Sequence, residues 1–361
     1  MRSDYGRCGL LNNLQPHSSK TDGPQLPYAA VMATGAASEL AATARASALR
    51  LPLFWLAVAM AVAIPIWHLV AHGKVRSRIA DLPYSRFGWF TIPIGLSVIG
   101  NGFAAFSGPT LHFATILTIC LAWVTTVLVM RETVLPLSRQ WPGVSKFEGS
   151  WFLAPAALLA DAIGLASLET HSALSGGPPL AWLAVVIAGL GALTYLVAIA
   201  LGSARLLRVG LGRRGTASWW IAAGCGGLSA AALGRVSSVV PAGFGIATSH
   251  AFGLLALFFW IIGSAALIPV VVASLGFLFR LRHLEGKPPW PPTFSTGVYA
   301  LGAAQVGRLL TARTVDTVSN VTAVATLTIW VVTVLAHTPR LFKKSRLQSL
   351  TPPERGTWKA P

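Results

Sequence analysis

The chain has 361 residues, of which 54% are hydrophobic and only 11% are charged, and its mean hydropathy is +0.63. Soluble domains average roughly 25% charged residues, so this composition excludes a water-soluble globular protein. The formal net charge of +17 does not indicate nucleic-acid binding, because Lys and Arg lie in short clusters between apolar runs and not on one basic face. The composition therefore predicts a polytopic membrane protein in contact with the lipid bilayer.

Apolar runs between charged breaks predict ten membrane-spanning helices, and hence an all-α fold. The first run is Ala-rich and carries Glu39, so a count of nine stays open. In chain order the predicted helices are 27–44, 51–71, 85–106, 109–130, 149–168, 179–204, 217–236, 249–279, 291–312 and 318–339. We expect residues 1–26 to be a disordered cytoplasmic tail, residues 27–340 the transmembrane domain, and residues 341–361 a basic cytoplasmic tail.

The distribution of charge predicts how the helices cross the membrane. With the N-terminus inside, 23 of the 28 Lys and Arg residues fall in the cytoplasmic segments, and the excess alternates from loop to loop. This agrees with the positive-inside rule. We therefore expect a multi-pass protein of the plasma membrane with both termini in the cytoplasm.

The ten predicted helices are of two kinds. The even-numbered helices are plain aliphatic and aromatic, whereas the odd-numbered helices after the first carry repeated Gly, and several also carry Pro. Small residues permit close helix packing in lipid, and breaks at membrane depth are tolerated inside protein or along a water-filled path. The odd helices are therefore predicted to form an inner layer inside an even-numbered jacket. Tight packing without a pore is the alternative that composition leaves open.

A short repeat favours a path through the inner layer. The segments FTIPIG (90–95), FLAPAA (152–157) and FSTGVY (294–299) each place Phe three residues before Pro or Gly, near the start of an odd helix. Similar depth would place them around one constriction. The residues predicted to line it are Phe90, Pro93, Phe152, Pro155, Gly224, Ser295, Thr296 and Gly297.

Four segments carry a resemblance to a known family: AVMATGAAS, SWFLAPAALLA, SWWIAAGCGGLSAAAL and TFSTGVYALGAAQVGRL. Across about residues 27–340 the chain resembles the tellurite-resistance/C4-dicarboxylate transporter family, which includes plant slow anion channels. The resemblance implies five helical hairpins around a central pore, a homotrimer, and a phenylalanine on the ninth helix that blocks the pore. Phe294 occupies that position, and Ser295 follows it where the family usually has Pro.

Ionisable residues inside a membrane domain are candidates for function. Asp161 lies in the middle of the fifth predicted helix, where it would either couple transport to protons or form a structural pair with a cation such as Arg235. Arg235, Arg308 and Arg313 lie at the outer ends of the seventh and ninth helices, where they would form a vestibule that attracts anions. Snorkelling of these arginines to the interface is the alternative.

The sequence thus predicts a protein that moves small anions through a central pore gated by Phe294. A proton-coupled carrier that uses Asp161 and a membrane subunit without transport activity are the alternatives. Paired acid–base residues, metal ligands at usable spacing and nucleotide-binding motifs are not found, so we expect neither an enzyme nor a cofactor or metal. Cys8, Cys120 and Cys225 have no disulfide spacing.

Overall fold

The computed structural model describes residues 25–44, 46–71, 85–106, 108–139, 143–171, 178–210, 216–240, 245–278 and 290–350. Within these ranges the regular structure is entirely helical. Ten α-helices follow one another along the chain, with short 3₁₀ segments before α3 and α5. Their bounds are α1 Gln25–Thr43, α2 Ser47–Ala71, α3 Thr91–Ala104, α4 Pro109–Arg139, α5 Leu153–His171, α6 Pro178–Val209, α7 Thr216–Ser237, α8 Gly245–Leu278, α9 Trp290–Leu310 and α10 Arg313–Leu350; the 3₁₀ segments are η3 Ser85–Phe90, η4 Val144–Lys146 and η5 Gly149–Phe152.

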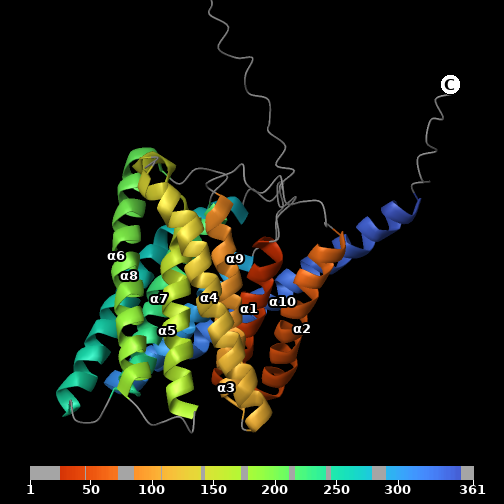
Figure 1. Ribbon diagram of the computed structural model, residues 1–361. Coiled ribbons are helices and arrows are strands. Elements are labelled where there is room, and N and C mark those ends of the chain that lie inside the picture. The colour runs from red at the N-terminus through yellow and green to blue at the C-terminus, as the bar shows by residue number, and fades with distance from the viewer. Residues whose placement is uncertain are drawn as a thin grey trace, which may run out of the picture.

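Consecutive helices pair into five hairpins: α1 with α2, α3 with α4, α5 with α6, α7 with α8, and α9 with α10. The first members of the hairpins close a ring, because α1 packs on α3, α3 on α5, α5 on α7, α7 on α9, and α9 back on α1. Figure 1 shows these helices running up and down in one bundle, with α10 extending beyond it toward the C-terminus. The predicted all-α fold of five hairpins is confirmed, and so is the inner position of the odd helices.

The two kinds of helix differ in what covers them. The apolar windows of α3 and α5 are 61% and 83% buried within the chain, whereas those of α2, α4, α6, α8 and α10 are 17–33% buried. Large aliphatic and aromatic side chains therefore face outward from the even helices, as lipid contact requires. Within the described residues seven helices are long and apolar enough to cross a membrane.

The three helices below that threshold are α1, α7 and α9, all members of the ring. Their Gly, Ser, Thr and Ala side chains lower the hydropathy that lipid contact would demand, and neighbouring helices replace lipid around them. Each has 19 to 22 residues, and about 20 are enough to cross the hydrocarbon core at 1.5 Å per residue. Hydropathy alone therefore identifies seven of the ten helices as membrane-spanning. The length of the other three and their places in the ring support the predicted count of ten.

Glycine permits the closest helix contacts in the ring. A Cβ atom on Gly302 of α9 would lie 2.3 Å from the carbonyl oxygen of Gly227 on α7, and one on Gly226 would lie 2.4 Å from Cα of Gly263 on α8. Apolar burial supplies little drive for association between helices in lipid, so close backbone approach at small residues takes its place. Helix α7 thus packs tightly on both α8 and α9.

The predicted boundaries differ from the observed ones mainly in the jacket. Helix α4 continues to Arg139, nine residues beyond its predicted end, and α10 continues to Leu350 through half of the segment predicted as a basic tail. The α10 extension is mostly polar, whereas in α4 the apolar stretch continues to Leu137 beyond the charged pair Arg131–Glu132 at which the predicted helix stopped. Residues 1–24 of the predicted N-terminal tail and residues 351–361 lie outside the described part of the chain.

Candidate functional site

A cavity of about 200 Å³ opens between helices α1, α2, α3, α7 and α9. It lies at the end of the bundle where α1, α3, α7 and α9 finish and α2 begins, which the charge distribution predicts to be the outer face. We call it the outer cavity. Its lining residues are Gly35, Ser38, Glu39, Arg50, Phe54, Val98, Asn101, Gly102, Ala105, Phe106, Arg235 and Leu301.

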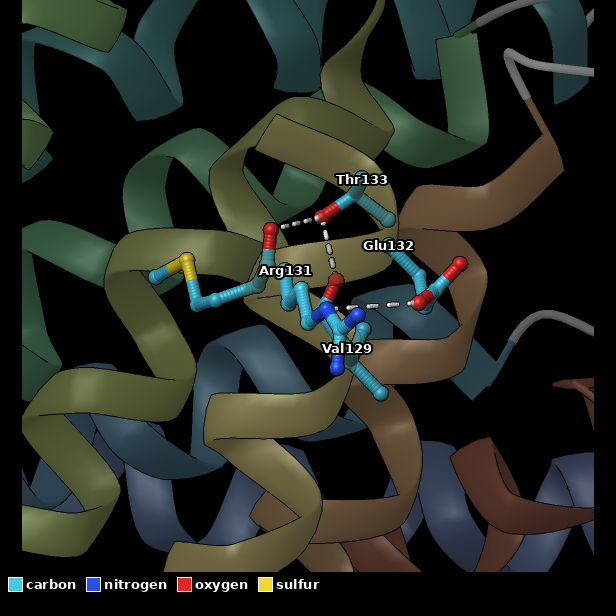
Figure 2. Close-up of polar contacts among 5 residues, drawn as sticks. Val129, Arg131, Glu132 and Thr133 are labelled. Carbon is cyan, nitrogen blue, oxygen red and sulfur yellow. Dashed lines mark hydrogen bonds and ion pairs between the residues drawn. The ribbon is translucent and has the colours of Figure 1, made fainter. Parts of the chain in front are cut away.

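Two cations and one anion line the outer cavity. Arg50 comes from the start of α2, Arg235 from the last turn of α7, and Glu39 from the last part of α1. Both guanidinium groups act electrostatically on the Glu39 carboxyl group, yet neither lies within 4.0 Å of it. An ion pair on α4 joins Arg131 Nε and Glu132 Oε1 at 4.0 Å, with both side chains exposed (Figure 2). Neither residue lines the cavity. The cavity cations therefore keep their hydrogen-bonding capacity.

Arg50 is held at the cavity wall by its neighbours. Its guanidinium carbon lies 5.6 Å from the centre of the Phe106 ring, a cation–π contact. The Ser38 hydroxyl donates a hydrogen bond of 2.7 Å to the Arg50 carbonyl oxygen, which ties the start of α2 to α1. Phe106 packs on Phe54, which also lines the cavity. The Arg50 guanidinium group is thus held against the aromatic ring of Phe106 and does not extend freely into solvent.

Phe294 lies on the face of α9 that leads down from the cavity. Leu301 lines the cavity, and residues seven apart on a helix share a face two turns apart, so Phe294 lies about 10 Å deeper on the same stripe. Val298 comes between them on that stripe. The Phe294 side chain is only 3% exposed and Val298 only 2%. This part of α9, below the cavity, is therefore buried and apolar.

The apolar filling includes residues from other ring helices. Phe90, at the end of η3, and Ile94 of α3 are fully buried and belong to the same apolar cluster as Phe294 and Val298. Pro93 and Pro155 are buried in α3 and α5. The cluster extends through the bundle and includes Ala36 and Val236, which adjoin the cavity-lining residues Gly35 and Arg235.

Other residues predicted to line the pore lie in helix contacts instead. Ser295 packs against Gly224 across the α7–α9 interface, because a Cβ atom on Gly224 would be 2.9 Å from the Ser295 hydroxyl. Gly297 faces α1 and α10, where Ala36 would meet its Cβ at 3.2 Å. The Thr296 hydroxyl donates to the Pro292 carbonyl oxygen at 2.8 Å within its own helix. Their small size serves the packing of α9, and α9 continues unbroken from Trp290 to Leu310.

Phe152 is also turned away from the ring axis. Its ring makes edge contacts with Tyr195 of α6 and Trp219 of α7, with centroids 6.1 Å apart in both pairs, and with Phe147 at 5.6 Å. It fills the interface between α5, α6 and α7. The repeat that grouped Phe152 with Phe90 and Phe294 therefore joins residues in different environments.

Asp161 lies between α3, α4 and α5, away from the outer cavity. The Ser97 hydroxyl of α3 donates a hydrogen bond of 2.7 Å to the Asp161 carboxyl group, and Thr126 of α4 lies beside the same group. Asp161 is only 2% exposed. Its partner is thus a serine of the ring and not Arg235, which was the structural partner suggested from sequence.

Of the three arginines predicted to form the outer vestibule, only Arg235 lines the cavity. Arg308 lies near Arg235, but the Arg308 guanidinium donates to the Gln305 side chain at 2.5 Å and to the Gly234 carbonyl oxygen at 3.4 Å. Arg313 is exposed at the start of α10. Sequence reasoning missed Arg50, which lies between two predicted helices, and used Glu39 to question the first predicted helix. Their proximity arises only when α1 and α2 pack.

The fold and the site together define an integral membrane protein of the anion-transport class: a ring of small-residue helices in an apolar jacket, with an arginine-lined cavity at one end. A sequence model of the voltage-dependent anion channel family, SLAC1, matches residues 27–338. The chain belongs to this family, which is also that of the tellurite-resistance/dicarboxylate transporters and plant slow anion channels. No curated protein matches the chain significantly. Among the described residues no three His, Cys, Asp or Glu side chains gather as a metal site.

Proposed function

We propose that this protein conducts small anions across the plasma membrane along the axis of the helix ring, and that Phe294 gates the path. The observation that carries the proposal is the single face of α9 that holds both Leu301, in the wall of the cavity, and Phe294, in the apolar cluster beneath it. Anions drawn into the cavity by Arg50 and Arg235 meet a dry segment at Phe294. A hydrophobic constriction of this kind stops ions because it excludes water.

The candidate substrates are inorganic monovalent anions, C4-dicarboxylates, and oxyanions such as sulfite and tellurite. The positive field of the cavity favours anions as a class. The excess of Lys and Arg at the other end of the bundle supports a cytoplasmic location for both termini. A homotrimer, as the family resemblance implies, would bury part of the apolar jacket, and mass measurement in lipid nanodiscs would test it.

Removal of the Phe294 ring tests the gate. Phe294→Ala should raise anion flux into proteoliposomes about tenfold, which corresponds to a barrier lowered by about 1.4 kcal/mol. Chloride and nitrate uptake, driven by a potassium diffusion potential, would measure the change.

Phe152→Ala is the matched control, since it removes the same side chain from another buried site, next to α6 and α7. We expect this variant to melt at a lower temperature without a gain in flux. Unchanged flux in a folded Phe294→Ala protein would contradict the gate. Equal gains in both variants would show that general loosening, and not an opened path, raises the flux.

A further inference from the structure

The outer cavity combines features that go beyond a general attraction for anions. It encloses about 200 Å³, which is room for about seven water molecules at about 30 Å³ each. That space admits one small anion with part of its hydration shell. The walls come from five helices, four of them in the ring, so the cavity is formed by the assembled fold and not by a flexible loop.

The donors around the cavity are arranged for a single anion. The Arg50 and Arg235 guanidinium groups are free of ion pairs among the described residues, and a guanidinium presents a fork of N–H donors to an anion. Asn101 adds a carboxamide whose Oδ1 atom is buried and accepts no hydrogen bond from any described residue. The unpartnered oxygen is an acceptor and would not bind an anion, but the NH₂ group of the same carboxamide can donate to one.

Glu39 sets the charge of this arrangement. With the two guanidinium groups and the Glu39 carboxyl group all ionised, the described residues that line the cavity carry a net charge of one positive unit. One monovalent anion neutralises that charge, whereas a divalent anion would leave an excess of negative charge beside the Glu39 carboxylate. Like charges in a partly desolvated cavity repel strongly, so Glu39 acts against divalent anions.

We infer that the outer cavity is a binding site for a small monovalent anion, with Arg50, Arg235 and Asn101 as ligands and Glu39 as the residue that disfavours divalent anions. This inference rests on the proposed anion transport and narrows its substrate class from anions in general to monovalent ones. The C4-dicarboxylates then become poor occupants of this site, although the family includes proteins that carry them.

The test measures anion binding to the purified full-length protein in detergent, separately from flux. Melting temperature is followed as sodium gluconate is replaced by sodium chloride or sodium sulfate at constant ionic strength, since a bound ligand raises it in proportion to RT ln(1 + [L]/Kd). Sulfate also stabilises proteins without binding, so only differences between variants are interpreted. Arg131→Gln is the matched control, because it removes an exposed arginine of α4 outside the cavity.

Arg235→Gln and Arg50→Gln should each weaken chloride binding about tenfold to a hundredfold, the loss expected for one charge-assisted hydrogen bond. Glu39→Gln should shift the preference toward sulfate by at least about tenfold relative to chloride. Arg131→Gln should bind as the unchanged protein does. If a glutamine variant does not fold, Arg235→Lys keeps the charge without the fork and should give an intermediate affinity.

Chloride binding that is the same in the unchanged protein and in both cavity-arginine variants would overturn the inference. So would an unaltered chloride-to-sulfate preference in Glu39→Gln. Retained chloride binding in a protein that moves no anion in proteoliposomes would instead refute the proposed transport and leave the site intact. The binding measurements therefore test the anion site, and the flux measurements test the proposed transport, so each proposal is contradicted by a different result.

Discussion

At the scale of single residues, the same chemical type has different roles according to the face on which it lies. Phe294 and Phe152 begin two similar sequence segments. Phe294 lies on the same face of α9 as the cavity-lining Leu301, whereas Phe152 packs in an aromatic cluster against α6 and α7. Arg50 lines the cavity while Arg308 is bound to Gln305 and to the α7 backbone. Side-chain identity gives the candidates, and the direction of the side chain selects among them.

Asp161 is expected to be structural. Asp161→Asn keeps an oxygen that can accept from Ser97, so it should cost about 1 kcal/mol or less, whereas Asp161→Ala leaves the buried Ser97 hydroxyl without its acceptor and should cost about 1–3 kcal/mol. Thermal unfolding of the purified variants measures both effects. The flux and its pH dependence should be the same in Asp161→Asn as in the unchanged protein.

A change of flux or of its pH dependence in Asp161→Asn would favour the alternative function, a proton-coupled carrier. If Asp161→Asn melts normally but loses a pH-dependent component of anion flux, the carboxyl group exchanges protons during transport. The position of Asp161 between α3, α4 and α5 argues against this, because the residue is buried and does not line the outer cavity.

At the scale of helices, the ring depends on backbone contacts that only glycine allows. In Gly302→Ala the new methyl group would lie 2.3 Å from the Gly227 carbonyl oxygen, a backbone atom that cannot rotate away. The α7–α9 interface would have to separate, and overpacking of this kind costs about 1–3 kcal/mol. We expect a lower melting temperature, followed by tryptophan fluorescence, and a smaller fraction of monodisperse protein.

Gly189→Ala is the control within the jacket. A Cβ atom on Gly189 of α6 would meet no atom within 4 Å, and Ala has the higher helix propensity. This variant should be as stable as the unchanged protein or slightly more stable. Equal melting temperatures for the two alanine variants would show that the tight α7–α9 contact does not limit stability.

At the scale of the whole molecule, the distribution of charge predicts the orientation in the membrane. Ser238, just after α7, and Lys146, just before α5, are both exposed and lie at opposite ends of the bundle. In a protein without its native cysteines, Ser238→Cys should react with a membrane-impermeant thiol reagent on intact cells. Lys146→Cys should react only after permeabilisation. The reverse pattern would place both termini outside and invert the proposed vestibule.

The sequence by itself determined the large-scale organisation of this protein. Few charges and long apolar runs required a membrane fold, and the contrast between small-residue and aliphatic helices indicated which would be inside. Both signals are properties of whole segments, so they do not depend on the correct assignment of any single residue. The end of α10 was placed too early because its last turns are mostly polar, and that of α4 because the charged pair Arg131–Glu132 interrupts an apolar stretch that continues to Leu137.

Only the tertiary structure decided which residues meet. Gly224, Ser295 and Gly297 were predicted to line a pore because they are small, but small residues equally permit helix contact, and the helix faces assign them to contacts. Arg50, Glu39 and Arg235 come together from α2, α1 and α7 to form one charged cavity. Such a site depends on the rotation of each helix about its own axis, which is set by packing against neighbours and is not specified by any local pattern.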